Sequence, residues 1–284
     1  MDYNVRQDLL FIREILGYSQ EQMARQIGLS RETIKRIENY GYKPSFDTIN
    51  KIYDYAFKKN IKINSLKEYF YFEEAKSSEK ILFHGTKSEI KGEISPFVSR
   101  DNLDFGKGFY CGTSYEQTVS FVSRFPDSSI YILSFSHTNL THVTFNVDQE
   151  WMLSIAYFRG RLKGYEDKLI IKKILNKIKE ADYIIAPIAD NRMFRIIDRF
   201  IDGEITDEQC KHCLAATNLG CQYVLLNEKA TKSIKILDRC FISLLEREKC
   251  DEIRKNDVND GDNKVKAALI KYKNEGKYIE EILK

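Results

Sequence analysis

The sequence predicts an α+β protein that begins with an all-α domain. Three observations predict this class. Apolar residues recur at helical spacing in residues 4–66, and residues 80–240 alternate short β-type runs with helical stretches. The length of 284 residues exceeds one average domain and leaves room for two cores. We therefore expect domains at 1–66 and 80–240, a linker at 67–79 and a charged helical tail at 241–284.

Four short helices are expected in the first domain. The first carries one apolar stripe, made of Val5, Leu9, Ile12 and Leu16. Ser19 and Gln22 form a capping box for the second helix. Gly28 makes the next turn, Ser30 caps the third helix, and the fourth follows Pro44-Ser45. A helix, a glycine turn and a serine-capped helix form the helix-turn-helix layout.

This segment resembles the phage repressor and Cro family. The matching positions are Ser19-Gln20-Glu21, Ala24, Gly28, Ser30-Arg31, Ile37-Glu38 and Pro44-Ser45. The resemblance implies that the third helix enters the DNA major groove and that the protein binds as a homodimer. The implied DNA-binding residues are Gln20 on a phosphate, Ser30 at the helix start, and Arg31, Thr33 and Lys35 on bases. The alternative is that Arg31 and Lys35 form a solvated face and the domain binds protein.

Charge and composition favour a protein that contacts phosphates and argue against a membrane or secreted protein. Residues 1–66 hold 11 Lys and Arg against 8 Asp and Glu, whereas the remainder holds 34 of each. This small excess has the sign expected for contact with phosphates. No apolar run approaches the roughly 20 residues needed to span a bilayer, and no secretory signal opens the chain. We therefore expect a cytoplasmic protein with no membrane partner.

Two polar stretches resemble metal sites without completing them. Cys210-Lys211-His212-Cys213 lacks the second ligand pair of a structural zinc site, so the six cysteines are expected to be reduced thiols. Residues 256–263 resemble a calcium loop, but Ala267 stands where the loop needs glutamate. We predict no metal site, and a polar loop at 256–263.

The motifs that carry chemistry lie in residues 80–240. A β-type run ends in His84-Gly85-Thr86, a Gly-x-Gly-aromatic turn follows at 105–110, and Gln222-Tyr223-Val224 forms a late strand. In this order they resemble the ADP-ribosyltransferase superfamily, most closely the catalytic domain of poly(ADP-ribose) polymerases. The resemblance implies a split, mostly antiparallel sheet with helices, and NAD as co-substrate.

The same resemblance implies a nicotinamide pocket. Its residues are His84, Gly85, Thr86, Gly108, Tyr110, Thr118 and Phe121. His84 would bond the adenosine-side ribose, the Gly85 backbone would pair with the carboxamide, and Tyr110 would stack on the cationic ring. Thr118 and Phe121 stand where polymerases have an amide-binding serine and a second stacking tyrosine. Taken singly, each side chain is better explained as a core residue; their joint spacing favours the pocket.

The sequence departs from the superfamily at Gln222, where polymerases have glutamate. Glutamine still accepts a hydrogen bond from a ribose hydroxyl, but it offers no charge to an oxocarbenium-like transition state. One charge at about 4 Å and a dielectric near 20 is worth up to about 4 kcal/mol, on the order of a thousandfold in rate. In the superfamily this replacement accompanies transfer of a single unit. We treat His84, Tyr110, Gln222 and Asp190 as the catalytic candidates.

Asp190, which ends a buried-type strand, is a candidate compensating carboxylate. Asp104 and Glu228 are weaker candidates. The competing interpretations are a helix N-cap for Asp190 or Asp104 and a surface charge for Glu228. The Asp-Phe-Gly-x-Gly-Phe-Tyr turn and the Ile-Ala-Asp stretch also resemble an uncharacterised bacterial family related to ADP-ribosyltransferase toxins.

The leading hypothesis is therefore a DNA-binding, NAD-dependent mono-ADP-ribosyltransferase. It would act as a toxin or phage-defence effector whose helix-turn-helix half represses its own operon or delivers it to DNA. The acceptor (protein, nucleic acid or water) and an antitoxin partner stay open. One alternative is a transcription regulator whose inactive pocket senses NAD or ADP-ribose. Another makes the C-terminal half a protein-interaction module.

Overall fold

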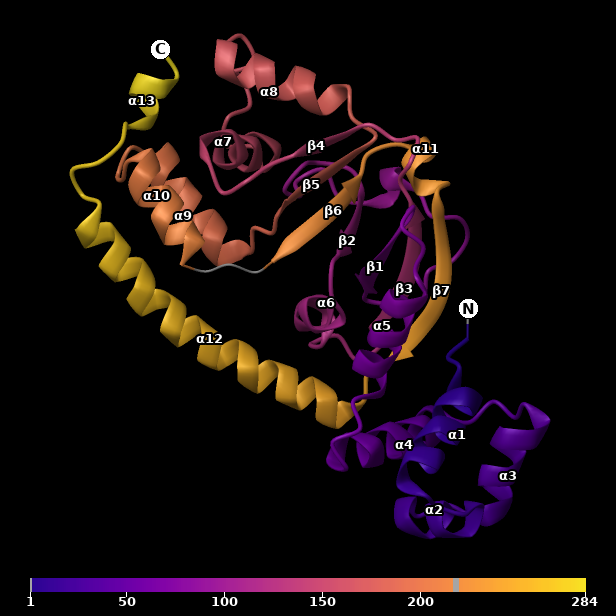
Figure 1. The fold of residues 1–284 in the computed structure, drawn as a ribbon. Coiled ribbons are helices and arrows are strands. Elements are labelled where there is room, and N and C mark those ends of the chain that lie inside the picture. The colour runs from indigo at the N-terminus through magenta and orange to yellow at the C-terminus, as the bar shows by residue number, and fades with distance from the viewer. Residues whose placement is uncertain (1, 217–219) are drawn as a thin grey trace. The chain divides into compact units, whose positions relative to one another are not determined.

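The structure, a computed structural model, describes residues 2–216 and 220–284, so Met1 of the expected first domain lies outside it. The fold is mixed α and β, with a helical N-terminal region followed by strands and further helices (Figure 1). The chain divides into two compact units. The first comprises Met1–Lys91, Ser114–Ser134 and Ile236–Ile253, and the second comprises Gly92–Thr113, Phe135–Lys235 and Arg254–Lys284. Within the described residues, no helix has both the length and the apolar character needed to cross a membrane.

The first unit opens with five helices. They are α1 (Val5–Leu16), α2 (Gln20–Ile27), α3 (Arg31–Tyr40), α4 (Phe46–Lys58) and α5 (Ile63–Glu74). Ser19 and Gln22 form the predicted capping box of α2, and Ser30 caps α3. Gly28 has a φ of +68°, a left-handed conformation that favours glycine and turns the chain between these two helices. The four helices predicted up to residue 66 are confirmed.

The core of the helical region includes a residue from far along the chain. Phe241 is 1% exposed and packs among the apolar side chains of α1 to α4. Its ring centroid lies 5.3 Å from that of Tyr3, 5.3 Å from that of Phe46 and 5.1 Å from that of Tyr53. The helix-turn-helix core is therefore completed by the end of the strand that contains Phe241.

That strand belongs to the rest of the first unit. Its elements are β1 (Glu79–Thr86), α6 (Tyr115–Val122), β3 (Ser129–Ser136), β7 (Ile234–Phe241) and the start of α12 (Leu244–Lys271). Strand β3 lies between β1 and β7. The expected linker at 67–79 contains most of α5, and Ser77-Ser78 forms the turn between α5 and β1.

Polar contacts also join the helical region to β7 and α12. The ammonium of Lys67 on α5 lies 2.7 Å from Asp8 and 2.9 Å from Asp238 of β7. On α4, Asn50 accepts a hydrogen bond from the Leu244 N–H and Asp54 accepts one from the Leu245 N–H, at 2.8 and 3.0 Å. Helix α4 thus supplies acceptors for the free N–H groups at the start of α12.

The second unit contains four strands in the order β4-β5-β6-β2. They are β2 (Phe109–Gly112), β4 (His142–Thr144), β5 (Tyr183–Pro187) and β6 (Cys221–Leu225). Strand β6 pairs antiparallel with both β2 and β5, as expected, whereas β4 and β5 run parallel. The parallel pair arises because two helices connect β4 to β5, giving a crossover long enough for this direction.

Helices make up much of the rest of this unit, and those other than Pro96–Val98 and Glu228–Thr231 contribute buried side chains to the second core around Trp151. They are η1 (Pro96–Val98), α7 (Gln149–Phe158), α8 (Leu169–Lys179), α9 (Asn191–Ile201), α10 (Asp207–Ala215), α11 (Glu228–Thr231), the remainder of α12 and α13 (Ile279–Ile282).

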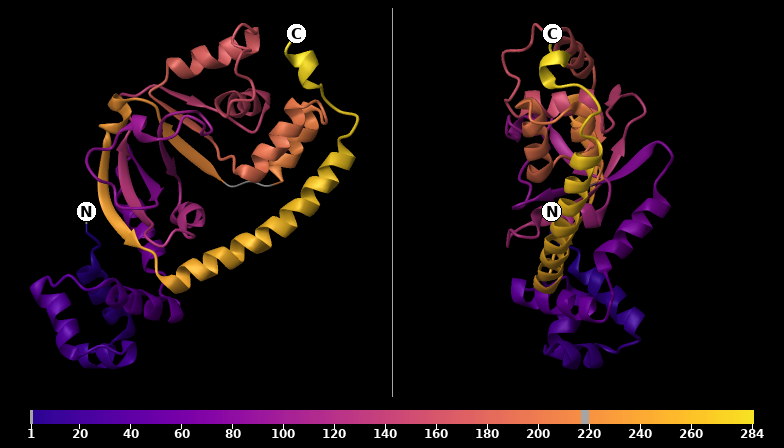
Figure 2. Two further views of the ribbon diagram at one scale, coloured as in Figure 1. Left: turned by 180° about the vertical axis from the view of Figure 1, so that it is seen from behind. Right: turned by 90° about the vertical axis from the view of Figure 1, so that its left-hand side faces the viewer.

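The prediction of a polar loop at residues 256–263 is wrong. Helix α12 continues through this stretch without interruption (Figure 2). The apolar side chains of Val265, Leu269 and Tyr272, which follow the stretch, pack against the second core. This packing offsets the low helix propensity of the Asn, Asp and Gly residues before them.

Candidate functional site

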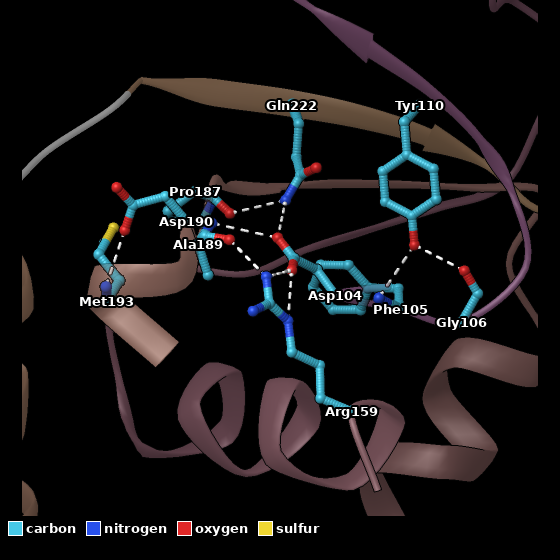
Figure 3. A network of polar contacts seen from close by, with 10 residues as sticks. All are labelled: Asp104, Phe105, Gly106, Tyr110, Arg159, Pro187, Ala189, Asp190, Met193 and Gln222. Carbon is cyan, nitrogen blue, oxygen red and sulfur yellow. Dashed lines mark hydrogen bonds and ion pairs between the residues drawn. The ribbon is translucent and has the colours of Figure 1, made fainter. Parts of the chain in front are cut away.

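The second unit contains a buried polar network centred on Asp104 (Figure 3). One carboxylate oxygen of Asp104 accepts hydrogen bonds from Nε (3.1 Å) and Nη2 of Arg159. The other accepts from the Ala189 N–H at 3.1 Å and from Nε2 of Gln222 at 2.9 Å. Asp104 is 6% exposed. Such a carboxylate is stable when it is paired and hydrogen-bonded, and both conditions are met here.

Gln222 of β6 is held in one orientation by this network. Its Nε2 donates to Asp104 and, at 3.0 Å, to the carbonyl oxygen of Pro187. Both partners are acceptors only, so the nitrogen of the amide must face them. Its Oε1 accepts no hydrogen bond from the described residues, and Figure 3 shows it directed to the side where Tyr110 lies. The network therefore leaves a carbonyl oxygen free to accept a hydrogen bond.

Tyr110 of β2 is anchored by the glycine turn that precedes it. Its hydroxyl donates to the Gly106 carbonyl at 2.8 Å and accepts from the Phe105 N–H at 3.1 Å. Burial raises the pKa of this phenol well above its ordinary value, so it stays protonated. Gly106 has a φ of +70°, and a Cβ on Gly108 would lie 2.6 Å from Cγ1 of Val224. Both glycines are thus needed to place the Tyr110 ring.

The other predicted pocket residues lie in the first unit. Gly85 on β1 approaches α6 so closely that a Cβ would lie 3.0 Å from Cγ2 of Thr118, which brings these two predicted residues together. The Thr118 hydroxyl donates its only proton to the Ser114 carbonyl at 2.8 Å, so it is not free to donate to a carboxamide. His84 and Thr86 lie on β1, and Phe121, which is 39% exposed, lies on α6.

The candidate carboxylates differ in their surroundings. Oδ1 of Asp190 accepts from the Met193 N–H at 2.7 Å and caps α9, which was the competing interpretation of this residue. Glu228 is a surface charge, which was the competing interpretation, and its carboxylate lies 2.9 Å from the ammonium of Lys232. Asp104, a weaker candidate, does not cap a helix as its competing interpretation had it, because it forms the buried ion pair with Arg159.

Sequence reasoning missed Arg159. It follows the last residue of α7 and is also bound to the Ala189 carbonyl at 2.6 Å, with its guanidinium 4.6 Å from the Phe194 ring centroid. The only signal in the sequence is a charged residue at the end of an otherwise buried helix.

The cysteines and the histidine of the Cys210-Lys211-His212-Cys213 stretch have other contacts. Cys210 donates weakly to the Ile196 carbonyl and Cys213 to the Val265 carbonyl, and His212 stacks on Tyr272. Across residues 2–216 and 220–284, no three side chains of metal-ligating type gather in one place.

The helix-turn-helix surface carries a hollow of about 420 Å³ between α2 and α3. Its lining residues are Gln20, Arg31, Glu32, Lys35 and Asn39. The hollow therefore brings together three of the predicted DNA-binding residues, and adds Glu32 and Asn39, which sequence reasoning missed. Arg31 is exposed and forms no ion pair within the described part of the chain.

Three of the predicted DNA-binding residues are already engaged inside the domain. Nε2 of Gln20 donates to Glu38 at 2.6 Å, and Glu38 is paired with Arg13 at 2.8 Å. The Thr33 hydroxyl lies 2.8 Å from that of Ser30, whose oxygen caps α3. The Gln20 amide keeps one further N–H, because only one of its two donors is used.

Comparison with known proteins identifies both parts of the chain. Residues 80–236 match a family described as "Protein of unknown function (DUF3990)". The chain belongs to this family. The DUF3990 match includes the residues of the Asp104 network, and residues 9–54 separately match the Helix-turn-helix family. The latter confirms the helix-turn-helix prediction, indicates DNA binding and suggests a regulator. No curated protein and no solved structure matches the chain.

Proposed function

We propose that this protein binds DNA through α2 and α3 and is an NAD-dependent mono-ADP-ribosyltransferase. The amide of Gln222 is the observation that carries the second part. Its nitrogen is committed to Asp104 and Pro187, so its oxygen is available to a hydroxyl such as that of a ribose. The His-Gly-Thr and Gly-x-Gly-Phe-Tyr motifs, which resemble those of ADP-ribosyltransferases, support the same ligand.

In the proposed reaction, the bond between the nicotinamide nitrogen and the ribose carbon breaks, and nicotinamide leaves with the bonding electron pair. A nucleophile of the acceptor bonds to that carbon and releases its proton to solvent. Gln222 would position the ribose without supplying negative charge. We therefore expect slow transfer of a single unit, to a protein, a nucleic acid or water.

Release of nicotinamide from labelled NAD tests the proposal. Tyr110→Phe and Tyr110→Leu both lose the hydroxyl that holds the glycine turn, but only the leucine variant loses the ring. Stacking on the cationic nicotinamide predicts release by the wild type and the phenylalanine variant, and a loss of at least about tenfold in the leucine variant. Equal activity in the two variants would contradict a stacking role for Tyr110.

A second candidate is a transcription regulator that senses NAD or ADP-ribose without turnover. The neutral amide at residue 222, together with an Asp104 carboxylate that is fully hydrogen-bonded, favours this alternative. Saturable NAD binding without nicotinamide release would support the sensor. Absence of both would overturn the enzyme and the sensor together, and would leave a DNA-binding protein with an interaction module.

The DNA-binding part has a separate test. Arg31→Ala removes an unpaired guanidinium at the start of α3, whereas Arg25→Ala removes one on α2 that is paired with Glu21. A base contact predicts that Arg31→Ala weakens binding to the cognate operator by about ten- to a hundredfold. Arg25→Ala should change it little. Fluorescence anisotropy on tiled fragments of the DNA upstream of the gene measures both, and equal losses would refute the role of Arg31.

A further inference from the structure

Position 222 requires a side chain with two hydrogen-bond donors on one atom. Nε2 of Gln222 meets the Asp104 carboxylate at 2.9 Å and the Pro187 carbonyl at 3.0 Å, and both are acceptors. A glutamate here would bring its carboxylate against another carboxylate and a carbonyl without a proton between them. Burial makes such an arrangement costly, because Gln222 and Asp104 are each 6% exposed.

Asp104 cannot move aside to relieve that conflict. Arg159 binds one of its oxygens through two nitrogens, and the Ala189 N–H binds the other. Arg159 is itself anchored to the Ala189 carbonyl and to the face of Phe194. The carboxylate of Asp104 is therefore held by Arg159, which follows α7, and by Ala189, which precedes α9 (Figure 3).

We propose that Asp104 and Arg159 are a positioning pair that orients the Gln222 amide, so that its oxygen is presented to a ligand hydroxyl. Glutamine at 222 is then the residue that this site requires, and not a weakened form of the polymerase glutamate. The role of the oxygen rests on the proposed function, with NAD as the ligand. The pairing of Asp104 with Gln222 does not rest on it.

The decisive variant is Gln222→Glu, which introduces the polymerase residue. The positioning pair predicts that nicotinamide release falls by about a hundredfold or more, with the KM for NAD raised. Asp104→Asn in the same chain removes the repulsion between the two carboxylates, and should recover at least about tenfold of the lost rate. The matched control is Gln209→Glu. Gln209 is equally buried and lies in the same unit, but its amide nitrogen meets only the Leu269 carbonyl. The Gln209→Glu control should lower the free energy of unfolding without changing the KM for NAD.

A double-mutant cycle in urea unfolding tests the pairing without NAD. The single variants Asp104→Asn and Gln222→Glu and their combination should show a coupling of about ten- to a hundredfold in the unfolding equilibrium constant, as expected for a charged buried hydrogen bond. Additive effects would overturn the pairing.

The activity results separate the inference from the function. A Gln222→Glu variant as active as the wild type, or more active, would overturn the inference and leave the proposed function standing. A wild-type chain that neither binds NAD nor releases nicotinamide would overturn the proposed function and the role of the oxygen, and the unfolding cycle would still decide the pairing.

Discussion

Phe241→Ala should destabilise the helix-turn-helix region, although residue 241 lies far outside it in sequence. Its ring is 1% exposed and contacts the rings of Tyr3, Phe46 and Tyr53. Removing a buried phenylalanine costs about 3–5 kcal/mol, because apolar contacts are lost and a cavity remains. The aromatic contacts place this site in the upper part of that range. A free energy in this upper part of the range corresponds to roughly a thousandfold or more in the local opening equilibrium.

Native-state hydrogen exchange of the α1–α4 amides measures this opening directly. The control is Phe200→Ala, because Phe200 is fully buried in the second unit. Trp151, the single tryptophan, lies in that same core, so its fluorescence should respond first to the control variant. Protection of α1–α4 that falls less than about threefold in Phe241→Ala would refute the conclusion that β7 completes this core.

Two further predictions concern packing and pH. Gly108→Ala places a Cβ 2.6 Å from Cγ1 of Val224, so it should cost about 1–3 kcal/mol in urea unfolding, and Val224→Ala in the same chain should relieve part of the strain. Burial raises the pKa of Glu246 to about 7, although the Tyr115 hydroxyl donates to its carboxylate. A raised folded-state pKa means that wild-type stability falls as pH rises from about 4.5 to 7, by about 3 kcal/mol in total. Glu246→Gln should therefore be more stable than the wild type at pH 8 and should lose this advantage near pH 5. An equal difference in unfolding free energy between Glu246→Gln and the wild type at pH 5 and pH 8 would contradict the raised pKa of Glu246.

The sequence was most informative where the structure is local. The caps at Ser19 and Ser30 lie within three residues of the N–H groups that they bind, so spacing alone predicts them. The Asp104–Arg159 pair joins residues that are 55 positions apart, and only the closed fold brings them together. From the sequence, Asp104 was accordingly only a weaker candidate carboxylate, with a helix N-cap as the competing interpretation. Long-range pairing of this kind leaves no periodic signal in a single sequence.

The same limit explains the error at residues 256–263. A run of Asn, Asp and Gly has the composition of a loop. In this chain the apolar residues that follow it anchor the helix to the second core, which the composition of the run does not reveal.

The acceptors that Asn50 and Asp54 provide at the start of α12 have an evolutionary consequence. A helix-turn-helix borrowed from a repressor without an amide and a carboxylate at these two places would not supply the acceptors. The recipient chain would then lose both side-chain acceptors at the start of its longest helix, which would weaken the start of that helix. The N-terminal module of this protein should therefore diverge in step with its own C-terminal half, and not spread as an exchangeable cassette.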